Sequence, residues 1–163
     1  MIAIQLNEQV RRPAGAIFMP YAPDHYSYIN TNNKDIGAIG EVVSQQKLID
    51  AQADMGEAIS VLIHGRPAGI FGIVPIWKGI AEFWFIPDEA LRNYPMFMTK
   101  AARTFIDICA ISYGLHRQQI TVRCDHKEAV KWAKALGFQQ EGLLRSYGPD
   151  RSDFYMMSIV RQA

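Results

Sequence analysis

The part of the chain from Ala81 onward constrains the fold most, because strand and helix patterns alternate there. In chain order these patterns predict a strand at Ala81–Ile86, a helix at about Tyr94–Tyr113, a strand at Gln119–Cys124, a helix at His126–Leu136 and, after Gly137-Phe138, a β-hairpin of Glu141–Tyr147 and Asp153–Val160. Strands separated by helices are joined by crossover connections, so we expect the sheet to become partly parallel after Cys124.

The segment before this part predicts consecutive antiparallel strands. Ala58–His64 is rich in Ile, Val and Leu, Gly65-Arg66-Pro67 forms a turn, and Ala68–Ile76 runs back before Trp77-Lys78-Gly79 turns into Ile80–Ile86. The whole chain is therefore predicted to be a single α+β domain, with a mixed, mostly antiparallel, twisted sheet flanked by helices.

The N-terminal part carries weaker signals. The expected elements are a short strand or loosely held arm over Met1–Pro13, a strand at Gly15–Tyr21, a helix opening at Ala22-Pro23-Asp24 with Asp24 as its cap, a loop at Asn30–Asp35, and a helix at Gln45–Ala53 that Ser44 caps and Gly56 ends.

Composition excludes several classes of function. The 163 residues fit one domain, and with a net charge of +1 and scattered basic residues we expect no nucleic-acid partner. No apolar run has the length of a membrane span or of a signal peptide, so we expect a soluble cytoplasmic protein with no membrane partner. Cys109 and Cys124 are expected as reduced thiols, and His25 and His64 lack partners at metal-ligand spacing, so no metal site is predicted.

Several segments resemble the GCN5-related N-acetyltransferase (GNAT) superfamily. They are His126–Phe138, similar to the family's N-x-x-A-I-x-x-Y-x-x-x-G-F segment, Glu141-Gly142 with Leu144-Arg145-Ser146, similar to its E-G-x-x-R strand, and Phe154–Ile159, similar to its last strand. The resemblance covers roughly residues 57–160 and is weak before them. It implies the GNAT fold and, in active members, transfer of an acetyl group from acetyl-CoA to an amine.

The same resemblance places the diphosphate of acetyl-CoA on Arg92–Phe97, where the family has a glycine-rich loop. Pro95 and Phe97 occupy the glycine positions here. Proline has no N–H to donate, and the Phe97 side chain is expected to lie where the diphosphate would approach the backbone. We therefore expect no bound cofactor, except acetyl-CoA if the protein is an active acyltransferase.

The residues that resemble the family's catalytic positions also differ. The position of its general-acid tyrosine is Ala133, which has no proton to donate, while Tyr147 and Tyr155 in the hairpin are alternative phenols or packing residues. Glu82 is a candidate general base or a carboxylate at a solvated strand start. His126, beside Asp125, is a candidate base or a helix cap.

Two hypotheses of function follow. Glu57–Pro67, Glu82–Ile86 and a helix without a glycine pair are similar to phage-encoded GNAT-like proteins, some of them linked to the internal core of short-tailed virions. This resemblance implies a diverged, non-catalytic protein of virion structure or assembly, located in the host cytoplasm or the virion, that acts through protein partners or self-association.

The alternative is an active acetyl-CoA-dependent N-acyltransferase for a small-molecule or protein amine. In that case the catalytic candidates are Glu82 and His126, and the cofactor-binding candidates are Phe85, Ile86, Pro87, Arg92 and Asn93. The alternative predicts an open cleft between the strands that end at Ile86 and Cys124. The first hypothesis allows Phe97, Tyr94 or Trp84 to fill that cleft.

Overall fold

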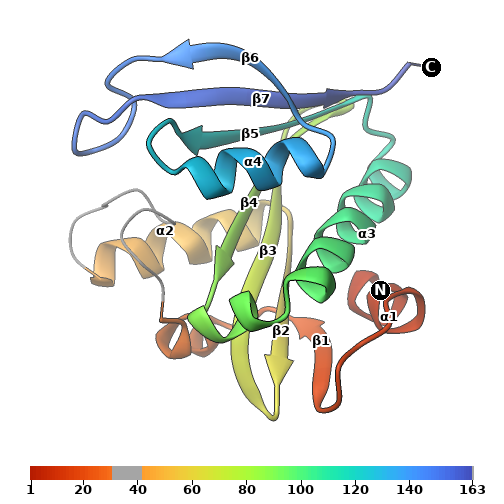
Figure 1. The fold of residues 1–163 in the computed structure, drawn as a ribbon. Helices are drawn as coiled ribbons and strands as arrows, with labels where there is room; N and C mark the ends of the chain where they lie inside the picture. The colour runs from red at the N-terminus through yellow and green to blue at the C-terminus, as the bar shows by residue number, and fades with distance from the viewer. Residues whose placement is uncertain (31–41, 163) are drawn as a thin grey trace.

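The computed structural model describes residues 1–30 and 42–162. Its strands are β1 (Ala16–Pro20), β2 (Glu57–Ile63), β3 (Arg66–Trp77), β4 (Ile80–Pro87), β5 (Arg117–Arg123), β6 (Gln139–Leu144) and β7 (Phe154–Val160). Its helices are α1 (Ile2–Gln9), α2 (Val42–Met55), α3 (Pro95–Tyr113) and α4 (Lys127–Ala135), with short 3-10 helices η1 (Pro23–Tyr28) and η2 (Glu89–Asn93). The predicted α+β class is confirmed, and Figure 1 shows the helices on both sides of one sheet.

The strands form a seven-stranded sheet in the order β1-β2-β3-β4-β5-β7-β6. The predicted meander from β2 to β4 is confirmed as antiparallel. The parallel pairing lies between β4 and β5, earlier than expected. After Cys124 the expectation of parallel strands is wrong, because β7 inserts between β5 and β6 and pairs antiparallel with both.

The parallel pairing of β4 with β5 is short, and the candidate site described below lies where it ends. Its register joins Ile80–Glu82 of β4 to Arg117–Gln119 of β5. Beyond these residues β4 continues to Pro87 and β5 to Arg123 without a ladder between them, and Figure 1 shows the two strands diverging. Backbone groups of β4 that face β5 are therefore unpaired with it along Phe83–Pro87.

The two faces of the sheet carry separate apolar clusters, as the period-2 alternation of strand side chains requires. On the face covered by α1 and α3, the main core includes Leu6, Phe71, Phe83 and Phe105. On the opposite face, under α2 and η1, a smaller cluster contains Tyr26, Ile49, Ile70 and Ile86. Consecutive residues of β3 and β4 thus point to different faces.

The N-terminus differs from the sequence expectation. Met1–Pro13 is neither a strand nor a loose arm, because Ile2–Gln9 forms α1 and packs against α3. Leu6 is fully buried, and the Asn7 side chain makes hydrogen bonds of 2.8 and 2.9 Å with the backbone C=O and N–H of Phe18. Helix α1 therefore covers the outer edge of β1, which would otherwise expose unpaired backbone groups.

Two predicted caps are wrong. Asp24 lies inside η1, whose N-cap is Ala22, and the Ala22 N–H donates to His25 Nδ1 at 3.1 Å. Helix α2 begins at Val42, so Ser44 lies within the helix, whereas its end before Gly56 is as predicted. The loop expected at Asn30–Asp35 lies outside the described residues except for Asn30.

Candidate functional site

A cleft of about 750 Å³ lies where β4 and β5 diverge. Its walls come from both faces of the sheet: Leu48 and Ile49 belong to α2, whereas Met98 and Phe105 belong to α3. Helix α4 contributes Trp132 and Ala133. The strand separation therefore opens a mostly apolar cleft that is lined by residues from both faces of the sheet.

Glu82 lies at the point where the two strands separate. It pairs with Val74 of β3 and Gln119 of β5, and Gln119 Nε2 donates to Glu82 Oε2 at 3.4 Å. Burial in this mostly apolar cleft raises the pKa of Glu82, and the Gln119 hydrogen bond opposes the shift. A carboxylate with a raised pKa that lines a cleft is suited to accept a proton near neutral pH.

Trp84 lies two residues further along the same strand face and also lines the cleft. Its indole packs across Gly72 of β3, where an added Cβ would collide with the ring. Trp84 Nε1 is buried and has no hydrogen-bond partner among the described residues. The aromatic run Phe83–Phe85 is typical of core and cleft wall, but it gives no signal of this unpaired donor.

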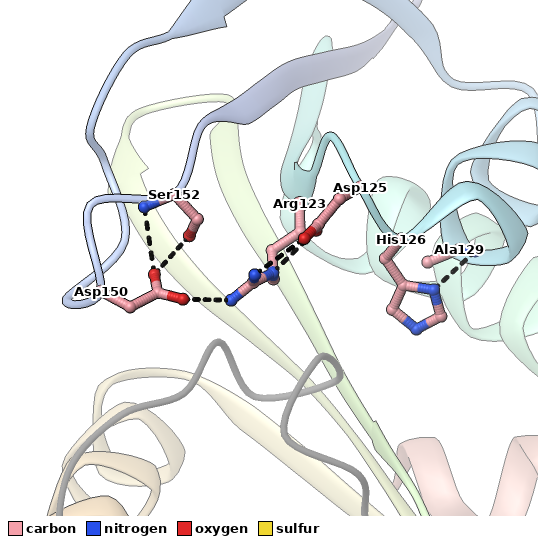
Figure 2. Close-up of polar contacts among 6 residues, drawn as sticks. All are labelled: Arg123, Asp125, His126, Ala129, Asp150 and Ser152. Carbon is pink, nitrogen blue, oxygen red and sulfur yellow. Dashed lines mark hydrogen bonds and ion pairs between the residues drawn. The ribbon is translucent and has the colours of Figure 1, made fainter.

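His126 is confirmed in its alternative role as a helix cap. Its side chain is 8% exposed, and Nδ1 accepts a hydrogen bond from the Ala129 N–H at 3.4 Å at the start of α4 (Figure 2). Because this nitrogen already serves as an acceptor, it is less suited than Glu82 to remove a proton. His126 still lines the cleft together with Glu82.

Arg123 is held between two carboxylates at the end of β5 (Figure 2). Its Nε and Nη2 donate to the two oxygens of Asp125, each at 3.0 Å, and its Nη1 donates to Asp150 Oδ2 at 2.9 Å. Asp125 thus makes two hydrogen bonds to Arg123.

Asp150 connects this arginine to the segment between β6 and β7. Its Oδ1 accepts from the Ser152 hydroxyl at 2.5 Å and from the Ser152 N–H at 3.1 Å. Hydrogen bonds from Ser152 and then Arg123 lower the pKa of Asp150 to about 2. The segment held in this way carries Tyr147, which lines the cleft. The sequence spacing did not reveal this pairing, because Asp150 lies far along the chain from Arg123.

The expected steric obstruction by Phe97 is wrong. Its side chain is buried in the main core, where its ring centroid lies 5.6 Å from that of Phe18, on the α1 side. Among the described residues that line the cleft, Trp84 is present, whereas Phe97 and Tyr94 are not. The cleft is therefore open despite the substitution at position 97.

The other departures from the family pattern remain. Pro95 is the first residue of α3, where the missing N–H costs the helix nothing but removes one donor from its N-terminus. Ala133 is buried in the cleft wall. Of the cofactor-binding candidates, Phe85, Ile86, Pro87 and Arg92 line the cleft, whereas Asn93 is exposed outside it.

The remaining predictions concern the two cysteines, metal binding and membrane-spanning helices. Cys109 and Cys124 are free thiols, and burial raises the pKa of both. In the part of the chain that the structure describes, no group of three or more His, Cys, Asp or Glu residues is arranged to hold a metal ion. Within the same residues, no helix combines the length and apolar character needed to cross a membrane.

Comparison with known proteins identifies the fold. No family model matches the chain, and no curated protein matches its sequence. Among solved structures, Ard1 from Thermoplasma volcanium has a TM-score of 0.73 at 18% identity and covers 92% of this chain and 100% of its own. At this identity the similarity concerns the fold alone.

Two further structures agree. The ribosomal-protein α-N-acetyltransferase RimL in complex with coenzyme A has a TM-score of 0.72 at 13% identity, covering 93% of this chain and 97% of its own. A variant of the spermidine N-acetyltransferase SpeG from Vibrio cholerae has a TM-score of 0.70 at 17% identity, covering 91% and 95%. The chain therefore has the GNAT fold, as the sequence resemblance implied.

Proposed function

We propose that this protein transfers an acyl group from an acyl-coenzyme A to an amine. The observation that carries the proposal is the open cleft between β4 and β5, with Glu82 on its wall and Phe97 turned away from it. The active alternative predicts an open cleft, and the open cleft therefore supports it.

The chemistry of the cleft fits an acyl-coenzyme A. Apolar walls suit the pantetheine arm, and the β4 backbone along Phe83–Pro87 can pair with its amides because β5 has moved away. Arg92 lines the same end of the cleft, and the backbone N–H groups of Met96 and Phe97 belong to the first turn of α3. Pro95 supplies no donor there, so we expect weaker diphosphate binding than in a glycine-rich loop.

An acyl-coenzyme A, when bound, supplies an acyl group activated as a thioester, which the amine takes up as an amide while the coenzyme leaves as a thiol. Glu82 accepts the proton that the amine loses, and Gln119 holds the carboxylate through its 3.4 Å hydrogen bond. Tyr147, held near the cleft through Asp150 and its neighbours, is the phenol available to protonate the leaving thiolate.

A non-catalytic role in virion structure or assembly is the second candidate. Pro95 and Ala133 favour it, because each lacks a group that the family's chemistry uses. Its phage origin rests on the sequence resemblance.

The test is release of free thiol from acetyl-coenzyme A in the presence of a panel of amines. We expect amine-dependent release by the unmodified protein, and loss of release in Glu82→Gln but not in Glu8→Gln, which changes an exposed carboxylate on α1. Thiol release that is independent of amine, or unchanged by Glu82→Gln, would argue against acyl transfer at this site.

A further inference from the structure

We infer that Arg117 is a positioning residue for Glu82, and that it acts through the side-chain amide of Gln119. This inference rests on the proposed function and adds a residue to its machinery. It is carried by a chain of hydrogen bonds that crosses the sheet from β6 to β4 and ends on Glu82. Among the described residues, Arg117 does not line the cleft, so its effect must pass through another side chain.

The first link of this chain fixes the orientation of the Gln119 amide. Arg117 Nε donates to Gln119 Oε1 at 3.0 Å. Because a guanidinium can only donate, the amide oxygen faces Arg117 and the amide nitrogen faces away from it. That nitrogen donates to Glu82 Oε2 at 3.4 Å. An amide without this restraint could turn its oxygen toward the carboxylate, and the two oxygens would repel each other.

The second link fixes the guanidinium. Its Nη1 and Nη2 donate to the two oxygens of Glu141, each at 2.7 Å, and the Ser158 hydroxyl also donates to Glu141. Hydrogen bonds from Arg117 and then Ser158 lower the pKa of Glu141 to about 2, so Glu141 keeps its charge where Glu82 takes up a proton. The two-point contact therefore holds the guanidinium in one orientation, with its Nε directed at Gln119.

The neighbouring glutamine of β5 supplies a matched comparison. Arg161 Nε donates to Gln118 Oε1 at 3.1 Å, and Arg161 Nη2 donates to Asp107 Oδ1 at 2.9 Å. Gln118 points to the opposite face of the sheet, where its Nε2 donates to the backbone oxygen of Ile106 at 2.8 Å. Two adjacent glutamines are thus held by the same chemistry, and of the two it is Gln119 that ends on a carboxylate of the cleft.

A change at Arg117 that keeps its charge separates geometry from electrostatics. Arg117→Lys retains a positive charge beside Glu141, but an ammonium cannot reproduce the planar fork that reaches both Glu141 and Gln119. The residues of α2 that line the cleft are uncharged. The other charged or titratable residues that line it are unchanged in this variant: Arg92, Arg123, His126, Glu128 and Tyr147.

The test is an NMR titration of the Glu82 carboxyl carbon in the ligand-free protein, assigned by its absence in Glu82→Gln. Burial raises the pKa of Glu82, and the Gln119 hydrogen bond counteracts this rise. Gln119→Met, which removes the donor at similar length, should therefore increase the proton affinity of Glu82 by about threefold to tenfold, the effect of one hydrogen bond.

Arg117→Lys should increase the proton affinity of Glu82 by at least about twofold. The double variant should match Gln119→Met alone, because Arg117 acts through Gln119. Arg161→Lys makes the same change on the opposite face of the sheet, so it should leave the titration of Glu82 unchanged.

Thiol release measured over a range of pH gives the second readout. We expect Arg117→Lys to lower kcat/KM by about threefold on the acidic limb, where Glu82 is protonated, and by less than about twofold on the plateau at higher pH. A purely structural role would lower the rate equally at all pH values, and that result would overturn the inference.

The two readouts separate this inference from the proposed function. An unchanged titration of Glu82 in Gln119→Met or in Arg117→Lys, or a further increase in the double variant, overturns the inference and leaves acyl transfer standing. A titration that follows the prediction, in a protein that releases no thiol with any amine, overturns the proposed function and leaves the coupling of Arg117 to Glu82 standing.

Discussion

Burial of Glu82 affects both the stability of the protein and the proposed proton transfer, because it raises the pKa of this carboxyl. Because its pKa is raised by burial, the folded state favours the protonated carboxyl. Its contribution to stability is therefore full at low pH and is lost as the pH rises through the raised pKa. Above this raised pKa the wild-type protein carries the cost of a partly buried carboxylate, which Glu82→Gln removes.

We predict that Glu82→Gln raises Tm at pH 7 while lowering kcat by roughly 10²–10⁴-fold, the usual contribution of a general base. In the wild-type protein kcat should rise with pH through the raised pKa of Glu82, and this acidic limb should disappear in the variant. Thermal melts and a pH–rate profile check both effects. A lower Tm together with an unchanged profile would contradict the role of Glu82.

At the residue scale the sequence indicated which residues to consider, but not which way their side chains point. The resemblance correctly drew attention to Phe97, yet its side chain points into the core, because a helix position faces the core or the cleft according to where the helix begins. Trp84 was predicted as part of a cleft wall, but an unpaired donor depends on the positions of all neighbouring atoms. No spacing in a sequence contains that information.

Helix α1 is an element that the sequence did not predict. Its buried residues Ile2, Ala3 and Leu6 have helical spacing, but the helix is only eight residues long and the exposed Ile4 obscures the pattern. The strands of the central meander were predicted within a few residues because their apolar runs are bounded by turns at Gly65 and Gly79, both of which have positive φ.

We predict that Leu6→Ala lowers the free energy of unfolding by about 2–5 kcal/mol, because it leaves a cavity between α1 and α3. Ile4→Ala, at an isoleucine of the same helix that is 58% exposed, is the control and should cost under about 0.5 kcal/mol. Guanidinium denaturation measures both. Equal, small effects would indicate that α1 is a loose arm after all.

The segment between β6 and β7 is the second element with a testable property. The pKa of Asp150 is about 2, below its ordinary value of 3.8. Its stabilising contribution is therefore present above pH 3.8 and is lost as the pH falls through about 2. Asp150→Asn should flatten the dependence of Tm on pH between these values. A wild-type slope that is retained in the variant would show that other carboxylates cause it.

For the whole molecule, the sequence predicted the fold class and most of the element order, but not the arrangement that makes the site. Each strand pattern fixes which side chains face the core, whereas the insertion of β7 between β5 and β6 is decided by long-range pairing. The same holds for the separation of β4 from β5 after Glu82, which creates the cleft. The candidate residues on β4 were predictable, whereas the open cleft beside them was expected only under the active alternative.

The N-terminus of α3 is where we expect the diphosphate of coenzyme A to bind, so changes there should alter the affinity for coenzyme A. Pro95→Gly restores an N–H at the first position of α3, and we expect it to tighten coenzyme A binding by about tenfold through one charge-assisted hydrogen bond. Phe97→Gly should instead damage the core, so its loss of binding would be accompanied by a lower Tm. Equal affinity of Pro95→Gly and wild type would place the diphosphate away from this helix.

The measurement that bears most directly on the cleft is calorimetric titration of acetyl-coenzyme A into the wild-type protein and two tryptophan variants of α4. Ala129 lines the cleft, whereas Ala135 is exposed at the other end of the same helix. We predict a wild-type dissociation constant between about 1 µM and 1 mM, retained in Ala135→Trp and lost in a folded Ala129→Trp. Absence of wild-type binding at millimolar ligand, or unchanged binding in Ala129→Trp, would contradict acyl-coenzyme A binding between β4 and β5.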